Sequence, residues 1–278
     1  MSVNPFCSMR ARYFLIVFTL LVLIERISKQ LLEKTFHISM SSFASILVLY
    51  IFPSLWLWYQ CKRHRIPFTL FVNRREAFNL LQVLMITGML CLFSYGYLVL
   101  YMYSFVWITP DFIINILHEP IIGSAGGYIY QFIIIVLVAP IVCEFVFRGF
   151  LFQRFAAKWG TGKAMVIVAL LFGCFHIDFL SAVMFSIVLS IVYIRTKSLL
   201  MPISIHMLNN AIVLITSFMF SKEEMISFAD FSNQTPFFTG LIIFIIGLNL
   251  VLVFLFVNRR YMNKEVSVVY TNKMRDIG

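Results

Sequence analysis

Long apolar runs separated by short basic segments constrain this chain more than any other feature. Several runs approach the roughly 20 residues that an α-helix needs to cross a bilayer. Of the 278 residues, 61% are hydrophobic and only 12% are charged, whereas a soluble domain carries about 25% charged residues. A transmembrane β-barrel would show short segments of alternating hydrophobicity, which this sequence does not show. We therefore predict an all-α fold, a polytopic membrane helix bundle.

The apolar pattern predicts about eight transmembrane helices, at residues 12–32, 40–60, 77–105, 127–150, 164–178, 180–195, 199–219 and 237–257. Lys and Arg test this number, because they are enriched in cytoplasmic loops. With the N- and C-termini both cytoplasmic, 17 basic residues fall in inner segments and 4 in outer ones. We thus predict a multi-pass integral protein of a cell membrane, and the Phe- and Ile-rich, cysteine-poor composition is typical of bacterial sequences.

The net charge of +10 does not indicate a nucleic-acid partner. The basic residues punctuate the apolar runs and form no stripe interleaved with aromatic side chains, so the expected partner is the lipid bilayer. The five cysteines form neither a CxxC pair nor a zinc-ligand spacing. The signatures HExxH and GxSxG, of zinc proteases and serine hydrolases, do not occur in the sequence.

Two ionisable residues, Glu144 and Arg148, lie near the end of the fourth predicted span, 127–150. Ionisable groups inside membranes are costly unless they are paired or hydrated. The i, i+4 spacing places both on one helix face, which fits either a structural salt bridge or one wall of a polar cavity. Pro140 precedes Glu144 by four residues. It removes a backbone N–H and frees a carbonyl that needs a polar neighbour.

Further polar residues lie on two later helices. His176 lies near a helix end, where a lone histidine more often forms an interfacial hydrogen bond than takes part in catalysis. His206 and Asn210 share one helix face. They can bind a ligand carbonyl, or they can join two helices. Asn209 points about 100° away and is the weaker candidate, and Asp178 is expected to mark a turn.

The combination of these residues indicates hydrolysis. A carboxylate, two histidines and an amide from three helices can converge in the bundle interior. Water activated by Glu and His, facing donors that stabilise an oxyanion, is the minimum apparatus for peptide cleavage. This chemistry requires no cofactor, and the residue types leave the presence of a divalent metal open. A transporter is less favoured, because the sequence shows no internal repeat.

Three motifs resemble the CPBP family of intramembrane proteases, which is named for CAAX-processing and bacteriocin-related members and is also called Abi. Its first motif, Glu-Glu-x-x-x-Arg, resembles the segment from Cys143 to Arg148. Its motifs Phe-x-x-x-His and His-x-x-x-Asn match Phe172 to His176 and His206 to Asn210. The resemblance covers about residues 128–215.

The resemblance implies a conical cavity that opens towards the membrane and the cytoplasm. It also implies that the first Glu of the family and His176 orient the attacking water. His206 and Asn210 then form the oxyanion site, and Glu144 and Arg148 support the geometry. Members of the family cleave prenylated or peptide substrates, while other members regulate partners without proteolysis.

Cys143 stands where the family has its first Glu. A thiol does not simply replace a carboxylate base, since its unperturbed pKa is about 8.5. Glu144 lies about 100° around an α-helix and can take over only if the helix rotates or unwinds near Pro140. A Cys143 nucleophile paired with His176 is a further coherent alternative.

We predict a CPBP/CAAX-type intramembrane endopeptidase that hydrolyses a membrane-anchored peptide or protein. The alternative is an inactive pseudoprotease, a membrane scaffold that binds a partner helix of a sensor kinase, a cell-wall enzyme or a bacteriocin system. The predicted catalytic residues are Glu144, His176, His206 and Asn210, supported by Arg148 and Cys143. The predicted organisation is an N-terminal membrane region (1–126), a catalytic-type core (127–219) and an outer loop, last helix and tail (220–278).

Overall fold

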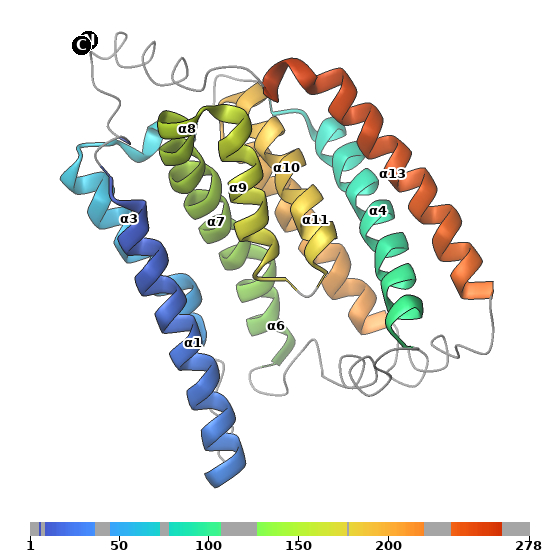
Figure 1. Cartoon of the computed structure of the whole chain (residues 1–278), viewed down its shortest axis with the longest axis horizontal. Helices are drawn as coiled ribbons and strands as arrows, with labels where there is room; N and C mark the ends of the chain where they lie inside the picture. Colours follow the sequence, from blue (N-terminus) through green and yellow to red (C-terminus); the bar gives the residue numbers. More distant parts are fainter. Residues whose placement is uncertain are drawn as a thin grey trace.

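All regular elements in the described part of the chain are helices (Figure 1). The computed structural model describes residues 6, 9–36, 45–72, 78–106, 127–176, 178–219 and 235–262. The helices are α1 (Ala11–Phe36), η2 (Leu47–Ile51), α3 (Phe52–Arg63), η3 (Phe68–Leu70), α4 (Leu80–Val106), α6 (Gly127–Gln131), η4 (Phe132–Val138), α7 (Ala139–Glu144), η5 (Phe145–Phe152), α8 (Gln153–Trp159), α9 (Thr161–Gly173), α10 (Phe179–Thr196), α11 (Leu200–Met219) and α13 (Thr235–Met262). The prediction of an all-α polytopic bundle is confirmed.

Each predicted membrane span overlaps a described helix. Five helical stretches are long and apolar enough to cross a membrane: Leu80–Ser104, Ile129–Trp159, Phe179–Thr196, Leu200–Ser217 and Thr235–Met262. Helix α9 is apolar but shorter, and α1 carries charged residues in its second half. The chain is therefore a multi-pass membrane protein.

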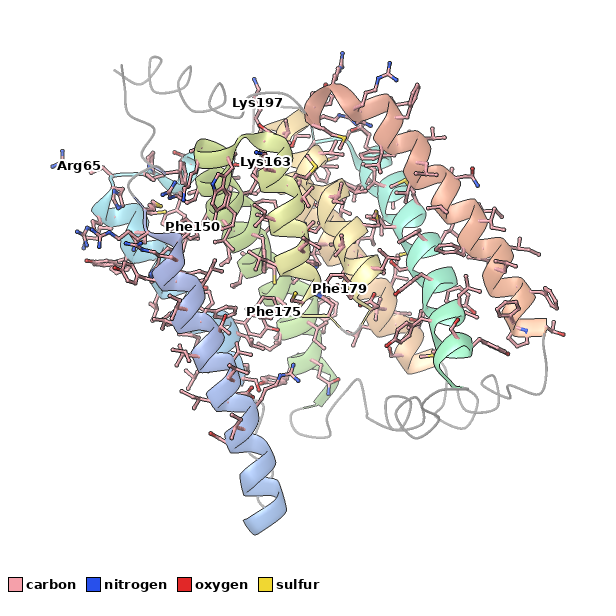
Figure 2. All side chains as sticks on the ribbon, in the orientation of Figure 1. Arg65, Phe150, Lys163, Phe175, Phe179 and Lys197 are labelled. Carbon is pink, nitrogen blue, oxygen red and sulfur yellow. The ribbon has the colours of Figure 1, made fainter. Side chains whose placement is uncertain are left out.

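The two ends of the described chain lie on the same side of the bundle. Helix α1 begins and α13 ends at the top of Figure 1. Figure 2 shows Arg65, Lys163 and Lys197 at this same end, where the predicted inner segments meet. The predicted domain boundary at 126 and the start of the predicted outer loop at 220 fall in 107–126 and 220–234, outside the described residues. The predicted boundary at 219 coincides with the end of α11.

Elements α6 to α8 form one continuous helix with two widened stretches, η4 and η5, in which hydrogen bonds run from residue i to i+5. Pro140 lies between them, at the start of α7. Because proline has no N–H to donate, it interrupts the regular α-helical ladder. Wide turns of this kind occur frequently at functional sites, and here they flank Glu144.

The hairpin of α9 and α10 is short for a membrane hairpin. Gly160, at a φ of 86°, reverses the chain between α8 and α9. The turn between α9 and α10 lies partway along α11 and α4 (Figure 1), and Phe175 and Phe179 mark this depth in Figure 2. The turn therefore places residue 176 partway along the length of the bundle and not at the end opposite the start of α1.

Candidate functional site

Glu144 and Arg148 form a salt bridge in the bundle interior. Arg148 Nη1 donates to Glu144 Oε1 over 3.0 Å, and both side chains are 0% exposed. The i, i+4 spacing on the helix produces this pairing, as the sequence predicts. Two unpaired charges at this depth would each cost several kcal/mol, so each group depends on the other.

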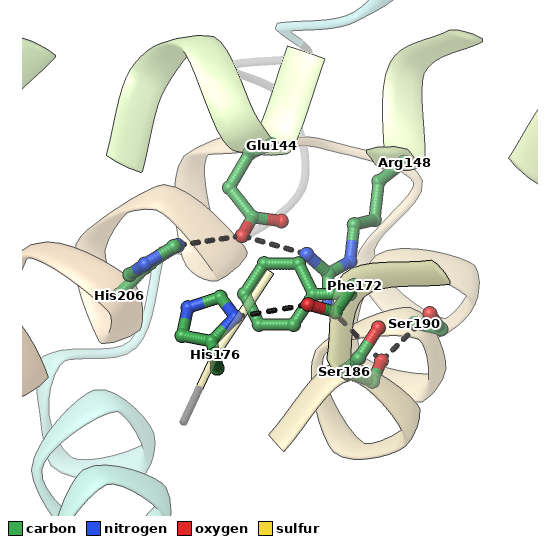
Figure 3. A network of polar contacts seen from close by, with 7 residues as sticks. All are labelled: Glu144, Arg148, Phe172, His176, Ser186, Ser190 and His206. Carbon is green, nitrogen blue, oxygen red and sulfur yellow. Dashed lines mark hydrogen bonds and ion pairs between the residues drawn. The ribbon is translucent and has the colours of Figure 1, made fainter. Parts of the chain in front are cut away.

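His206 joins this pair from another helix. Its Nδ1 lies 2.8 Å from Glu144 Oε1, the oxygen that also accepts from Arg148 (Figure 3). Helix α11 supplies His206, and the long helix of α6 to α8 supplies Glu144 and Arg148. One carboxylate oxygen thus connects two helices, while the other oxygen, Oε2, is buried without a hydrogen bond to any described residue.

Arg148 also contacts α10. Its Nη2 donates to the backbone carbonyl of Ser186 over 3.1 Å, and Ser190 Oγ donates to the same carbonyl over 2.8 Å. The hydroxyl of Ser186 itself has no hydrogen-bond partner among the described residues, nor has Arg148 Nε. The guanidinium is therefore oriented by one carboxylate and one main-chain carbonyl from separate helices.

Phe172 lies at the centre of the cluster. The Arg148 guanidinium lies 5.0 Å from the centroid of its ring, a distance that suits a cation–π contact. The His176 ring stacks on it at 4.5 Å, and the His206 ring meets it edge-on at 6.0 Å. Phe185 packs against His206 as well. The Phe172 ring therefore contacts all three polar side chains of Arg148, His176 and His206, although it forms no hydrogen bond with them.

His176 is oriented by its own helix end. Its Nδ1 lies 2.9 Å from the carbonyl oxygen of Phe172, and the side chain is exposed (Figure 3). The same carbonyl also accepts the backbone N–H of Phe175 over 3.2 Å, in the turn after α9. The histidine is thus oriented through one ring nitrogen by the end of its own helix.

Asn210 lies one turn after His206 on α11 and contacts the helix of Glu144 at a different level. Its Nδ2 donates to the carbonyl of Ile135 over 2.9 Å. In the i to i+5 pattern of η4, that carbonyl would accept from residue 140, which is proline. The structure therefore brings Glu144, Arg148 and His206 into direct contact, links His176 to them through Phe172, and directs one N–H of Asn210 to the backbone.

One segment of the chain is similar to a known protein family. Residues 125–212 match the family described as type II CAAX prenyl endopeptidase, Rce1-like. This segment is similar to the CPBP/CAAX family of intramembrane proteases. No curated protein and no solved structure matches it. The matched segment runs from just before α6 to α11, so it contains every member of the Glu144 cluster.

The position where the CPBP/CAAX motif has its first Glu differs in its surroundings from Glu144. Cys143 is half-buried against the apolar core, is not part of a disulfide, and makes no hydrogen bond with any described residue. In particular, none joins it to His176. Glu144, next along the helix, faces His206 instead. The widened turns on both sides of α7 accompany this orientation.

Two members of the Glu144 cluster cannot be identified from sequence patterns. The sequence indicates Phe172 only as the start of a motif, and it gives no signal for Ser186 because the contribution of Ser186 is a backbone carbonyl. Asn209 hydrogen-bonds with Cys91 over 3.5 Å and so lies on another face of α11. Within the described ranges, no three His, Cys, Asp or Glu side chains are grouped as metal ligands.

Proposed function

We propose that this protein is an intramembrane endopeptidase that cleaves a membrane-anchored peptide or protein, as the description of the family that residues 125–212 match suggests. The observation that carries the proposal is the buried contact of Glu144 with both Arg148 and His206. Ion pairs buried in apolar surroundings contribute little to stability on balance, so a purely structural benefit explains this one poorly. A polar cluster inside a membrane bundle is more typical of a reaction site.

The proposed catalytic residues are Glu144, His176, His206 and Asn210. The carboxylate and the imidazoles are the candidate proton acceptors for an attacking water, and the remaining amide hydrogen of Asn210 is the candidate donor for the oxyanion. Arg148 holds the charge of Glu144, and Cys143 fills the place of a second carboxylate. The expected substrate is a peptide whose lipid or apolar anchor brings it to the bundle from the bilayer.

A specific observation also favours a second function, that of a pseudoprotease scaffold. Cys143 brings no carboxylate to the cluster, and one amide hydrogen of Asn210 is committed to Ile135. Both features reduce the apparatus available for hydrolysis. In this case the same cluster would hold the helices in the arrangement that a partner membrane protein binds.

Purified protein in lipid vesicles tests the first function. The probe is a farnesylated peptide that ends in a CAAX sequence, and mass spectrometry measures release of the last three residues. We expect cleavage by the native chain and its loss in His206→Gln. The matched control is Tyr193→Phe, which removes a hydrogen bond of 2.8 Å from Gln153, outside the cluster. Equal cleavage by His206→Gln and the native chain would overturn the proposal.

Cys143→Glu separates the two functions. If the native chain is a scaffold that lacks the catalytic base, it does not cleave the peptide, whereas Cys143→Glu supplies a carboxylate and should cleave it. An endopeptidase that already works through Glu144 and His206 cleaves before the substitution and changes little after it.

A further inference from the structure

Both histidines of the cluster commit the same ring nitrogen. His206 Nδ1 lies 2.8 Å from a carboxylate oxygen of Glu144, and His176 Nδ1 lies 2.9 Å from the carbonyl oxygen of Phe172. A carbonyl and an ionised carboxylate can only accept hydrogen bonds. Each Nδ1 must therefore carry the hydrogen, which decides the role of the other nitrogen of each ring.

Charge counting gives the protonation state of His206. Arg148 already balances the charge of Glu144, and both side chains are 0% exposed. A second proton on His206 would leave an uncompensated positive charge in buried surroundings, which is strongly unfavourable. His206 is therefore a neutral imidazole with Nδ1–H, and its Nε2 presents a lone pair that accepts and does not donate.

Access separates the carboxylate from the imidazole. The Glu144 side chain is 0% exposed, whereas the His206 side chain is 7% exposed. Oε1 of Glu144 already accepts two hydrogen bonds, and Oε2 is buried. His176 is exposed. The imidazoles of the cluster therefore have accessible surface, whereas the carboxylate has none.

We propose that Glu144 is a positioning residue and that Nε2 of His206 is the proton acceptor for the attacking water. This inference rests on the proposed endopeptidase function. Glu144 fixes the tautomer and orientation of the ring, as a carboxylate does for a catalytic or metal-bound histidine. The assignment differs from what the family resemblance implies, in which His206 donates to the oxyanion.

The chemical step balances within these residues. The water oxygen forms a bond to the scissile carbonyl carbon while one water hydrogen passes to His206 Nε2. When the carbon–nitrogen bond breaks, that hydrogen passes from Nε2 to the leaving nitrogen. The second water hydrogen stays on the new carboxyl group until it ionises. His206 ends as it began, so no oxidant, reductant or other reactant is needed.

Glu144→Gln distinguishes positioning from direct proton transfer. The Arg148 and His206 donors converge on one oxygen, so a Gln amide is held with its oxygen at that point. It keeps the Nδ1–H tautomer of His206 but cannot act as a base. Because Glu144→Gln leaves the Arg148 charge unbalanced, cleavage is compared per amount of folded protein. On this basis we expect cleavage of the farnesylated peptide to fall by roughly 10–100-fold in Glu144→Gln. We expect a fall of roughly 10²–10⁴-fold in His206→Gln, with at least a tenfold gap between the two variants. Glu144→Gln as inactive as His206→Gln would overturn the inference.

Nitrogen NMR of the ¹⁵N-histidine-labelled protein tests the tautomer without any activity. The His206 signals are assigned by their loss in His206→Gln, and the signals of His64, outside the cluster, serve as the control. We expect Nδ1–H in the native chain and in Glu144→Gln. An Nε2–H or doubly protonated ring overturns the inference even if the peptide is cleaved. An Nδ1–H ring in a native chain that never cleaves the peptide overturns the proposed function and the base role together.

Discussion

Asn210 donates a hydrogen bond to the backbone carbonyl of Ile135 over 2.9 Å, between α11 and η4. The carbonyl is available because Pro140, five residues on, has no N–H for the wide turn of η4. A backbone acceptor at membrane depth needs a donor from protein or water. Asn210 therefore supplies from a side chain what Pro140 withholds from the main chain.

This relationship predicts coupling between Pro140 and Asn210. Asn210→Leu leaves the Ile135 carbonyl unsatisfied, which should cost about 1–3 kcal/mol of unfolding free energy. Pro140→Ala restores an N–H to the helix, so Asn210→Leu should cost much less in the Pro140→Ala background. Thermal unfolding in detergent of the four proteins gives the interaction energy. Strictly additive effects would show that the amide serves another purpose.

The buried ion pair predicts unequal effects of single and double substitutions. Either Glu144→Leu or Arg148→Met leaves one buried charge without its partner, and we expect each to destabilise the fold by about 3–5 kcal/mol. The double variant removes both charges and should recover most of this loss. Unfolding in detergent measures the three variants against the native chain. A double variant less stable than either single one contradicts the reading of the cluster as a functional rather than a stabilising feature.

The sequence predicted the Glu144–Arg148 pair because i, i+4 spacing is a local property of a helix. It did not predict that Glu144 would face His206, 62 residues away. That contact depends on how tightly the helix is wound near Pro140, and an α-helical estimate of 100° per residue does not apply to the widened turns of η4 and η5. Pro140 directly predicts the freed carbonyl, because proline has no N–H to donate. The sequence does not identify Asn210 as the donor to this carbonyl, because the spacing of His206 and Asn210 fits ligand binding equally well.

The packing of α4 against α13 predicts that two glycines cannot be replaced. A Cβ added at Gly96 would collide with the backbone of Phe244, and one at Gly247 would collide with the backbone of Phe93. Small residues of this kind let membrane helices approach closely. We expect Gly96→Ala or Gly247→Ala to cost at least about 1–3 kcal/mol, because backbone atoms cannot move aside as side chains can.

Gly88 is the matched control on the same helix. A Cβ there meets no atom within 4 Å, and alanine favours a helix over glycine by about 1 kcal/mol. Gly88→Ala should therefore be neutral or stabilising in a thermal unfolding assay, while the two contact glycines lose stability. Equal effects at all three positions would show that helix propensity, and not the approach of α4 to α13, decides the outcome.

Ser186 offers a substitution inside the cluster that should be tolerated. Its backbone carbonyl accepts from Arg148 Nη2 over 3.1 Å, and alanine retains that carbonyl. Its hydroxyl is buried without a partner among the described residues, and a buried unsatisfied donor costs about 1–3 kcal/mol. Ser186→Ala should therefore keep peptide cleavage and raise the unfolding temperature.

Ser190→Ala is the comparison, since the Ser190 hydroxyl donates to the Ser186 carbonyl over 2.8 Å. Loss of cleavage in Ser186→Ala with intact stability would instead place the hydroxyl in contact with substrate or water, and would add this residue to the catalytic set.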